Sequence, residues 1–357
     1  MRVLHVAEAF GGGVFEVVRL LTERSVGRGH EMAIAYGFRP ETPEDVRERI
    51  DPSVELFPLE PWASRSPQAQ LRARRELRRL ISQWKPEILH LHSSFAGIVG
   101  IGAGPWWLPT VYTPHAYAFS MKDQSRRRRI GYLLLERRVA RRATLVAGVS
   151  RSEARLARAA VDAPRVEAVA NGIPELDPGQ LPPVANRPSP IVLAMGRIGP
   201  QRQADACARI LGQVADVAEV AWVGGAAPGK PGLVELEAAG VPVTGWVDRA
   251  IALERLGAAT AYLHWTAWDG QPLSVLEAMA RDVVVVASDI EPNFELLGPE
   301  QVCRDEQEAA ELLRRVVLDP SFRERLLESQ RARRAYYGTE RMVDEWLALY
   351  ERVPREP

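Results

Sequence analysis

Short apolar runs alternate with helical segments along the whole chain, and this alternation limits the fold more than any other feature. The runs lie at residues 2–7, 32–37, 87–92, 109–114, 144–150 and 166–172, then at 191–196, 220–225, 241–245, 261–265 and 283–288. Strands that are separated by helices pair in parallel, with helices covering the sheet. We therefore expect an α/β protein with parallel sheets.

The length of 357 residues exceeds what one hydrophobic core usually serves, so two domains are expected. Between the two sets of runs, residues 174–190 contain six prolines and no apolar periodicity, as is typical of a linker. We predict Rossmann-like domains at 1–176 and 191–338, joined by a linker at 177–190. Residues 339–357 form a helix and tail, and the apolar positions Met342, Val343, Trp346 and Leu347 require a surface to pack on.

No apolar stretch approaches the roughly 20 residues of a membrane span, and the N-terminus enters a strand directly, without the regions of a signal peptide. The two cysteines, Cys207 and Cys303, form no CxxC pair, so neither a disulfide framework nor a structural metal is indicated. We expect a cytoplasmic protein that does not bind nucleic acid.

The net charge is zero, but residues 1–173 carry 27 Lys and Arg against 18 Asp and Glu, and the remainder of the chain carries 19 against 28. Much of the positive excess lies at residues 125–143, which read as an amphipathic helix with an arginine-rich face. The favoured interpretation is a solvated face over a core stripe of Ile130, Leu134 and Val139. The alternative is peripheral contact with an anionic membrane, at its inner face, or with a phosphate-bearing acceptor.

The stretch WDGQPLSVLEAMARD, residues 268–282, suggests an anion site. Pro272 suits the first position of a helix, so we expect a helix start at Gln271 or Pro272. The first free amides, those of Leu273 and Ser274, would then point toward an anion such as phosphate. The alternative is that Asp269 only favours the helix dipole and that Glu277 is a solvated helix residue.

Other unusual residues follow the apolar runs, and ligands of open parallel sheets bind at the carboxyl ends of strands. Gly11 to Gly13 form a glycine turn between a strand and a helix, a geometry that either admits a phosphate or only makes a tight turn. Arg197 and Arg202 follow the strand at 191–196, where two guanidinium groups would converge on one diphosphate or form a surface pair.

The segment at 224–230, GGAAPGK, has the wrong spacing for a P-loop, which argues against a nucleoside triphosphatase. His90 and His92 share one face of a strand, but no carboxylate occurs at a matching position and the chain contains no DxD. We expect these histidines to be polar residues at a strand end rather than metal ligands.

An ordered set of motifs extends over nearly the whole chain. It comprises GGGVFEVVRLL, PEILHLHSSFAGIVG, PTVYTPHAYAF, AGVSRSEA, ANGIP, GRIGPQRQ, WVGG, GWVD, DGQPLSVLEAMA and DIEPNFELL. This set resembles the retaining, sugar-nucleotide-dependent glycosyltransferases of family 4. The resemblance implies the GT-B fold, in which two Rossmann-like domains face each other across a cleft and the C-terminal helix packs back on the first domain.

The resemblance also implies roles for individual residues. Arg197 and Arg202 would hold the donor diphosphate, and Glu277, the second carboxylate of an E-x7-E motif, would bind the ribose. Gly12 and Gly13 would line the phosphate, and His115 would approach the donor sugar. The turn from Gly245 through Trp246 to Val247 would meet the nucleobase. Gly172 of ANGIP, Gly224 of WVGG, and Leu273 and Ser274 complete the expected binding set, and Asp269 joins Arg197, Arg202 and His115 in the expected catalytic set.

Three positions depart from the family pattern. Asp269 stands where the family usually has Glu, Arg202 where it usually has Lys followed by Gly, and Asp282 where EAMA is usually followed by Gly. The exchange at Arg202 preserves the charge, whereas Asp269 leaves the choice of donor sugar open.

The resemblance implies a retaining, metal-independent transferase that moves a sugar from a nucleoside diphosphate sugar, of the UDP or GDP type, to a hydroxyl acceptor. The acceptor is a polysaccharide or lipid-linked saccharide, or a natural-product aglycone. No cofactor is expected beyond the donor. The alternative is a noncatalytic sugar-nucleotide-binding or scaffold protein of the same fold.

Overall fold

A computed structural model describes residues 1–40, 42–174, 176, 189–226 and 228–353. The chain divides into two compact units. The first contains residues 1–120, 124–172 and 339–357, and the second contains residues 121–123 and 173–338. Most of the predicted linker, residues 177–188, lies outside the described part of the chain.

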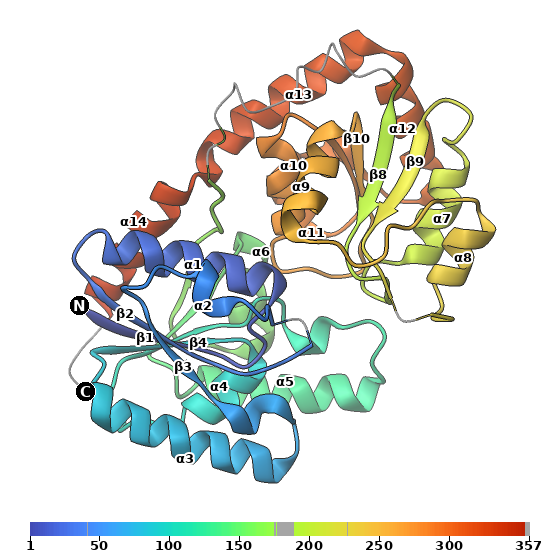
Figure 1. The fold of residues 1–357 in the computed structure, drawn as a ribbon. Helices are drawn as coiled ribbons and strands as arrows, with labels where there is room; N and C mark the ends of the chain where they lie inside the picture. The colour runs from blue at the N-terminus through green and yellow to red at the C-terminus, as the bar shows by residue number, and fades with distance from the viewer. Residues whose placement is uncertain (41, 175, 177–188, 227, 354–357) are drawn as a thin grey trace. The chain divides into compact units, whose positions relative to one another are not determined.

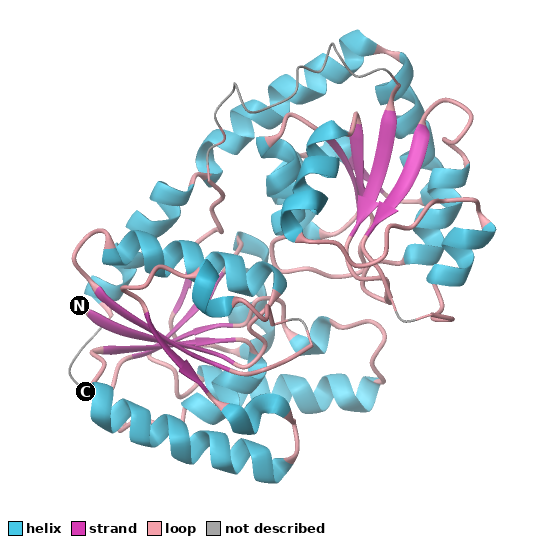
Figure 2. Cartoon of the chain, in the orientation of Figure 1, coloured by secondary structure: helices cyan, strands magenta, loops and turns pink. Residues whose placement is uncertain are grey.

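The first unit is built on a parallel sheet of seven strands in the order β3-β2-β1-β4-β5-β6-β7. Figure 2 shows the strands in magenta and the helices in cyan. Its strands are β1 (Arg2–Ala7), β2 (Glu31–Tyr36), β3 (Glu55–Pro58), β4 (Ile88–His92), β5 (Thr110–Thr113), β6 (Leu145–Gly148) and β7 (Val166–Ala168). Its helices are α1 (Gly12–Val26), α2 (Val46–Arg49), α3 (Pro67–Trp84), α4 (Ser94–Gly100), α5 (Arg126–Ala140), α6 (Arg151–Leu156) and α14 (Thr339–Arg352), with the short 3-10 helices η1 (Glu60–Ala63) and η2 (Ala118–Ser120) and the π-helix η3 (Ala157–Val161).

The two faces of this sheet differ because side chains alternate along each strand. Leu4 and Val6 of β1 and Leu89 of β4 share an apolar core with α3, α4 and α5. The opposite positions include His5 and His90, which lie side by side in the parallel register of β1 and β4. The sheet therefore presents buried histidines on the face away from that core.

Helix α14 belongs to the first unit, although it ends the chain (Figure 1). Met342, Val343 and Trp346 are buried, and the helix packs along α1. Arg28, just after α1, forms ion pairs with Glu340 and Asp344. The expectation that the C-terminal helix packs back on the first domain is thus confirmed.

The second unit holds a parallel sheet of five strands in the order β12-β11-β10-β8-β9. Its strands are β8 (Ile191–Met195), β9 (Glu219–Val223), β10 (Ala261–His264), β11 (Val284–Ser288) and β12 (Val302–Cys303). Its helices are α7 (Ala204–Gly212), α8 (Leu233–Ala238), α9 (Arg249–Ala258), α10 (Leu273–Ala280), α11 (Glu291–Leu297), α12 (Glu306–Leu318) and α13 (Pro320–Arg334), with short turns η6 (Pro299–Gln301) and η7 (Ala335–Tyr337).

The prediction of a strand at 241–245 is wrong. Val243 pairs only with Trp222, and Gly245 pairs only with Gly224. These two isolated bridges do not form a continuous strand. Two short strands that the sequence analysis missed, β3 and β12, lie at sheet edges, where little apolar patterning is required. Two parallel α/β sheets are confirmed.

Two sequence expectations concern membranes and cysteines. Within the described ranges, no helix combines the length and hydrophobicity that crossing a bilayer requires. Cys207 and Cys303 are both free thiols and both buried.

Helix α5 departs from the favoured interpretation of the arginine-rich segment. Val139 is buried as expected, but Ile130 is 48% exposed and Leu134 is 59% exposed. The expected core stripe is therefore wrong at Ile130 and Leu134, since the side of α5 that meets the core shared with α3 and α4 carries Leu133, Val139 and Ala140.

Candidate active site

Arg202 lies at the carboxyl edge of the second sheet, in the loop that connects β8 to α7. Its Nη1 is 3.3 Å from Oδ2 of Asp269 and 3.3 Å from Nε2 of His264. The Arg202 side chain is 20% exposed. Two neighbours thus orient a positive charge that solvent can still reach.

His264 ends β10, and it connects Arg202 to the start of α10. Burial, together with the nearby Arg202, lowers the pKa of His264 well below its usual value, so the ring is neutral. Because Nε2 accepts from Arg202, the proton sits on Nδ1, which faces the Tyr262 hydroxyl at 3.0 Å and Ser274 Oγ at 3.5 Å. The Tyr262 hydroxyl in turn donates to Ser274 Oγ at 3.0 Å. Hydrogen bonds through one neutral imidazole therefore connect Arg202 and Ser274.

Helix α10 starts at Leu273, with Pro272 as its N-cap. The expected start at Gln271 or Pro272 is thus one or two residues early, because Pro272 has extended rather than helical backbone. The amides of Val275 and Leu276 donate to the Pro272 carbonyl at 3.2 and 3.4 Å. The amides of Leu273 and Ser274 have no acceptor in the described part of the chain, so they are the free first amides that the sequence predicted.

Asp269 has two defined partners rather than a diffuse interaction with the helix dipole. Its Oδ1 accepts from the Gly270 amide at 2.9 Å, and its Oδ2 faces Arg202. Burial raises the pKa of Asp269, and the charge of Arg202 opposes that rise. This carboxylate therefore fixes both the turn before α10 and the guanidinium group.

Glu277 is not the solvated helix residue of the alternative interpretation. Its side chain is 6% exposed and forms an ion pair with Arg249 of α9. Arg249 was missed in the sequence analysis because the two residues lie 28 positions apart and share no motif. His264 was missed for a similar reason, although its place at the end of an apolar run offered a signal.

Arg197 lies two residues beyond β8, and its side chain is exposed in the same loop as Arg202. Gly224, at the end of β9, has a φ of +127°, and a Cβ there would come within 2.2 Å of the Gly196 carbonyl oxygen. The Gly224 amide donates to Thr244 Oγ1 at 3.0 Å. Close backbone packing thus explains this glycine without a ligand.

The turn predicted to meet a nucleobase lies beside that packing. Gly224 bridges to Gly245, and the next residue, Trp246, is 67% exposed. Val247 is half-buried. The turn is therefore held by the end of β9 while its indole stays accessible.

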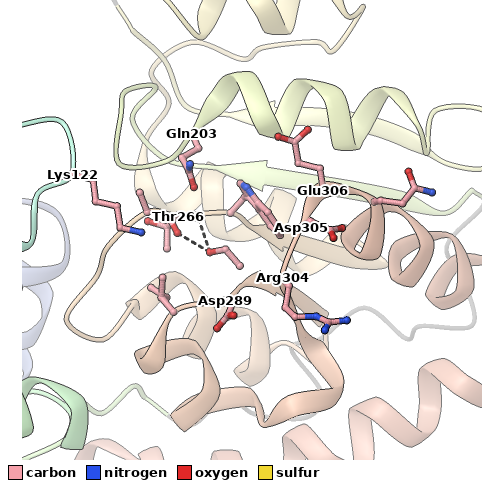
Figure 3. Close-up of a pocket in the computed structure, with 12 residues that line it drawn as sticks. Lys122, Gln203, Thr266, Asp289, Arg304, Asp305 and Glu306 are labelled. Atoms are coloured by element: carbon pink, nitrogen blue, oxygen red, sulfur yellow. Dashed lines mark hydrogen bonds between the residues drawn. The ribbon is translucent and has the colours of Figure 1, made fainter.

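A pocket of about 530 Å³ opens at the carboxyl ends of β10 and β11 in the second unit (Figure 3). Its lining residues are Lys122, Gln203, Trp265, Thr266, Ala267, Ser288, Asp289, Ile290, Arg304, Asp305, Glu306 and Gln307. Thr266 and Ser288 connect the two strand ends, with the Thr266 amide donating to Ser288 Oγ at 3.0 Å. The quoted motifs GRIGPQRQ and DIEPNFELL supply three of these residues, Gln203, Asp289 and Ile290, but the sequence analysis named no site there.

In the first unit, Gly12 and Gly13 form the exposed first turn of α1, directly beyond β1. Gly12 has a φ of +53°, and a Cβ there would meet nothing within 4 Å. An anion can therefore approach the backbone at the start of this helix of 15 residues.

His115 follows β5, with a φ of +51°, and Ala116 has a φ of +78°. Glu153 holds this unusual backbone by accepting from the amides of Ala116 at 2.6 Å and Val149 at 2.8 Å. The loop that presents His115 is thus fixed by a carboxylate from α6.

A chain of imidazoles leads from His115 into the sheet. His115 Nε2 is 2.9 Å from His92 Nδ1, and His92 Nε2 is 3.0 Å from His5 Nδ1. Burial lowers the pKa of His5 to about 3, and loss of solvent lowers that of His115 to about 4. These rings are neutral, so the proton on each one determines the proton position on the next.

His90 occupies the same face but bonds elsewhere. Its Nδ1 is 2.7 Å from the Tyr350 hydroxyl of α14, and its Nε2 is 2.9 Å from Thr113 Oγ1. Nitrogen atoms of His5, His90 and His92 all lie within 4.8 Å of one another, so the trio has the spacing of a metal site. In this structure the nitrogens of His90 and His92 bond to protein groups.

Gly172 is buried, and its amide lies 3.0 Å from the Met342 sulfur of α14.

Asp282 has a φ of +53°, the left-handed conformation that favours glycine, so the family's usual Gly has a structural reason at this position. Arg331 at 3.1 Å and Arg334 at 3.0 Å bind the Asp282 carboxylate.

Two family models match this sequence in succession. Residues 12–172 match the glycosyl transferase 4-like domain, and residues 189–319 match glycosyl transferases group 1. No curated protein matches the sequence.

Solved structures share the fold over nearly the whole chain. Sucrose-phosphate synthase from Thermosynechococcus elongatus is 19% identical, with a TM-score of 0.81 and 98% of each chain covered. HepE from Anabaena, solved in complex with UDP-glucose, is 15% identical, with a TM-score of 0.77 and coverage of 98% of this chain and 99% of that one. TarM from S. aureus is 10% identical, with a TM-score of 0.79 and coverage of 98% and 100%. The fold is that of the GT-B glycosyltransferases, and by its two domains this chain belongs to the glycosyltransferases.

Proposed function

We propose that this protein transfers a sugar from a nucleoside diphosphate sugar to a hydroxyl acceptor, with retention of configuration and without a metal ion. One observation carries the proposal. Arg202, held by Asp269 and His264, is connected through His264 to Ser274. Ser274 lies at the N-terminus of α10, where the amides of Leu273 and Ser274 have no acceptor among the described residues. A guanidinium group and a helix N-terminus are both suited to a phosphate.

These groups would act on the bond between the sugar and the diphosphate. As that bond breaks, negative charge grows on the departing phosphate, and donors that are already oriented stabilise it without reorganising. Arg202 and the amides of Leu273 and Ser274 would stabilise this charge, with Arg197 joining from the same loop. This arrangement supports metal independence because positive charge and oriented amides take the place of a Lewis acid.

The remaining predicted residues would fix the donor in the same proposal. Glu277 would bind the ribose with the carboxylate that Arg249 orients, and the exposed turn at Trp246 and Val247 would meet the base. His115 would approach the donor sugar as a neutral group, which both donates and accepts hydrogen bonds. Gly12 and Gly13 would face a phosphate oxygen.

Uridine donors are the first to test, because the HepE structure of the same fold contains UDP-glucose. We expect UDP-glucose or another nucleotide sugar from a panel of UDP and GDP donors to raise the melting temperature of the purified protein, since a ligand of the folded state stabilises it by mass action. With a suitable acceptor among saccharides and aglycones, NMR of the product should show the anomeric configuration of the donor.

The competing function is a protein that binds a nucleotide sugar without turning it over. Such a protein would show the thermal shift but neither donor hydrolysis nor transfer with any acceptor in the panel. A product of inverted configuration would refute the retaining mechanism while leaving the transferase activity in place.

A further inference from the structure

The outer surface of α3, α4 and α5 in the first unit is strongly basic. These helices pack in sequence over one face of the sheet (Figure 1). Helices α3 and α5 together contain 11 arginines and two glutamates. One of these, Glu136, is buried, where it accepts from Tyr112 at 2.6 Å and from Ser94. Little negative charge therefore balances this surface, which we call the arginine face.

Large apolar side chains are exposed on the same layer. Trp106 and Trp107, in the loop between α4 and β5, are 81% and 56% exposed. On α5, the exposed Ile130 and Leu134 lie one turn apart, with Arg127 and Arg138 continuing the same stripe at helical spacing. Two adjacent exposed tryptophans, together with exposed aliphatic and cationic side chains on α5, indicate an interaction surface rather than scattered exposure.

A groove of about 880 Å³ lies beside the tryptophans, between the end of α3 and the loop. Its lining combines apolar residues, among them Ile81, Pro105 and Leu108, with the cationic Arg78 and Lys85 and one carboxylate, Glu87. Arg78 also donates to the Gly102 carbonyl at 2.8 Å, which holds the loop against α3. The tryptophans are thus presented on a fixed support.

We propose that the arginine face docks on an anionic phospholipid bilayer, with Trp106 and Trp107 inserted at the level of the headgroups. Tryptophan prefers the membrane interface, because its ring is apolar while its N–H can bond to headgroups and water. Clustered arginines attract anionic lipids over about one Debye length, roughly 10 Å at 0.1 M salt. An acidic polymer would use the arginines alone, whereas a bilayer also covers Ile130 and Leu134.

Vesicle sedimentation tests this proposal with the full chain. Vesicles of phosphatidylcholine with 30% phosphatidylglycerol should bind the protein at 50 mM salt, and vesicles of phosphatidylcholine alone should bind it at least tenfold more weakly. Raising the salt to 500 mM should release most of the protein. The double variant Trp106→Ala/Trp107→Ala and the variant Arg126→Gln/Arg127→Gln should each lower the partition coefficient at least tenfold.

Matched controls come from the second unit. Leu318 is 62% exposed, and Arg314 is an arginine outside the arginine face that pairs with Asp216. Leu318→Ala and Arg314→Gln should bind vesicles like the unmodified protein, and melting curves should show that all four variants fold.

Three results would overturn the proposal. These are equal binding to neutral and anionic vesicles, no binding to either, and anionic binding that the tryptophan pair does not change. Capture by poly-glutamate without capture by vesicles would assign the face to an acidic polymer instead.

Discussion

His264 determines how Arg202 and Ser274, the two groups proposed to bind a phosphate, lie relative to each other. A charged imidazole at this position would repel Arg202, so the low pKa produced by burial is a condition for the arrangement. The sequence predicted Arg202, Asp269 and Ser274 as separate candidates. It did not indicate the histidine that joins them, because His264 and Arg202 lie 62 positions apart in the sequence.

Replacing Arg202 by Ala should weaken nucleoside diphosphate binding about tenfold to a hundredfold, since a charge-assisted hydrogen bond contributes about 1.5–3 kcal/mol. Arg197→Ala should act in the same direction. Calorimetric titration with UDP and GDP would measure both. The control is Arg314→Ala, which removes an arginine that pairs with Asp216 on the same unit. Unchanged affinity in folded Arg202→Ala protein would contradict the diphosphate assignment.

Substitution of Asp269 can distinguish a role in positioning Arg202 from a direct contact with the donor sugar. Asp269→Asn keeps the shape but removes the charge that holds Arg202, so a role in positioning Arg202 predicts weaker nucleotide binding together with slower turnover. A direct contact with the donor sugar predicts slower turnover at nearly unchanged nucleotide affinity.

Asp269→Glu tests the departure from the family pattern. Because Glu is longer by about 1.5 Å, this change should alter the relative efficiencies of several donors if the residue touches the sugar. Kinetics of the three proteins on a panel of nucleotide sugars would decide. Equal catalytic efficiencies for all three proteins and all donors would show that Asp269 does not contact the sugar. Its supported role would then be to fix the turn at Gly270.

The N-terminus of helix α10 leads to a prediction about metal dependence. If its free amides and Arg202 stabilise the leaving phosphate, activity should persist in EDTA, and added magnesium or manganese should change the rate little. Loss of activity in chelator that manganese restores would argue for a metal. It would also direct attention to His5, His90 and His92.

Strands β1 and β4, with the loop after β5, bury neutral histidines, and this predicts acid sensitivity. Below the ordinary histidine pKa of about 6.5, these histidines are protonated in the unfolded chain. In the folded chain, His5 and His115 stay neutral until the pH approaches their pKa values of about 3 and about 4. Stability should therefore be complete above pH 6.5 and fall as the pH decreases from 6.5 toward 4. Each such histidine contributes about 1.4 kcal/mol per pH unit.

Melting curves of the full chain between pH 7.5 and pH 4 would test this. His5→Phe should flatten the pH dependence, whereas His30→Gln, which changes a half-buried histidine outside the imidazole chain, should change it less. A stability that stays constant from pH 7 to pH 4 would show that the buried rings accept protons in the folded state.

For the whole molecule, the sequence predicted ten of the strands because each is a short apolar run between helices. It failed where tertiary context decides. Residues 241–245 have the pattern of a strand but pair at only two points, and Ile130 and Leu134 have the pattern of a core stripe but face solvent. The pocket at Thr266 and Ser288 was missed because its residues follow different strands, and only Gln203, Asp289 and Ile290 belong to quoted motifs.

The return of α14 to the first unit has a consequence for synthesis. A ribosome releases residues 173–338, the contiguous part of the second unit, before it releases the helix that completes the first. Until then His90 lacks its Tyr350 partner, and the side of α1 that α14 covers stays open to water or to a chaperone. The domain translated first would thus be the last to finish folding, and a chain stopped at Gly338 should yield a protease-resistant second unit beside a labile first one.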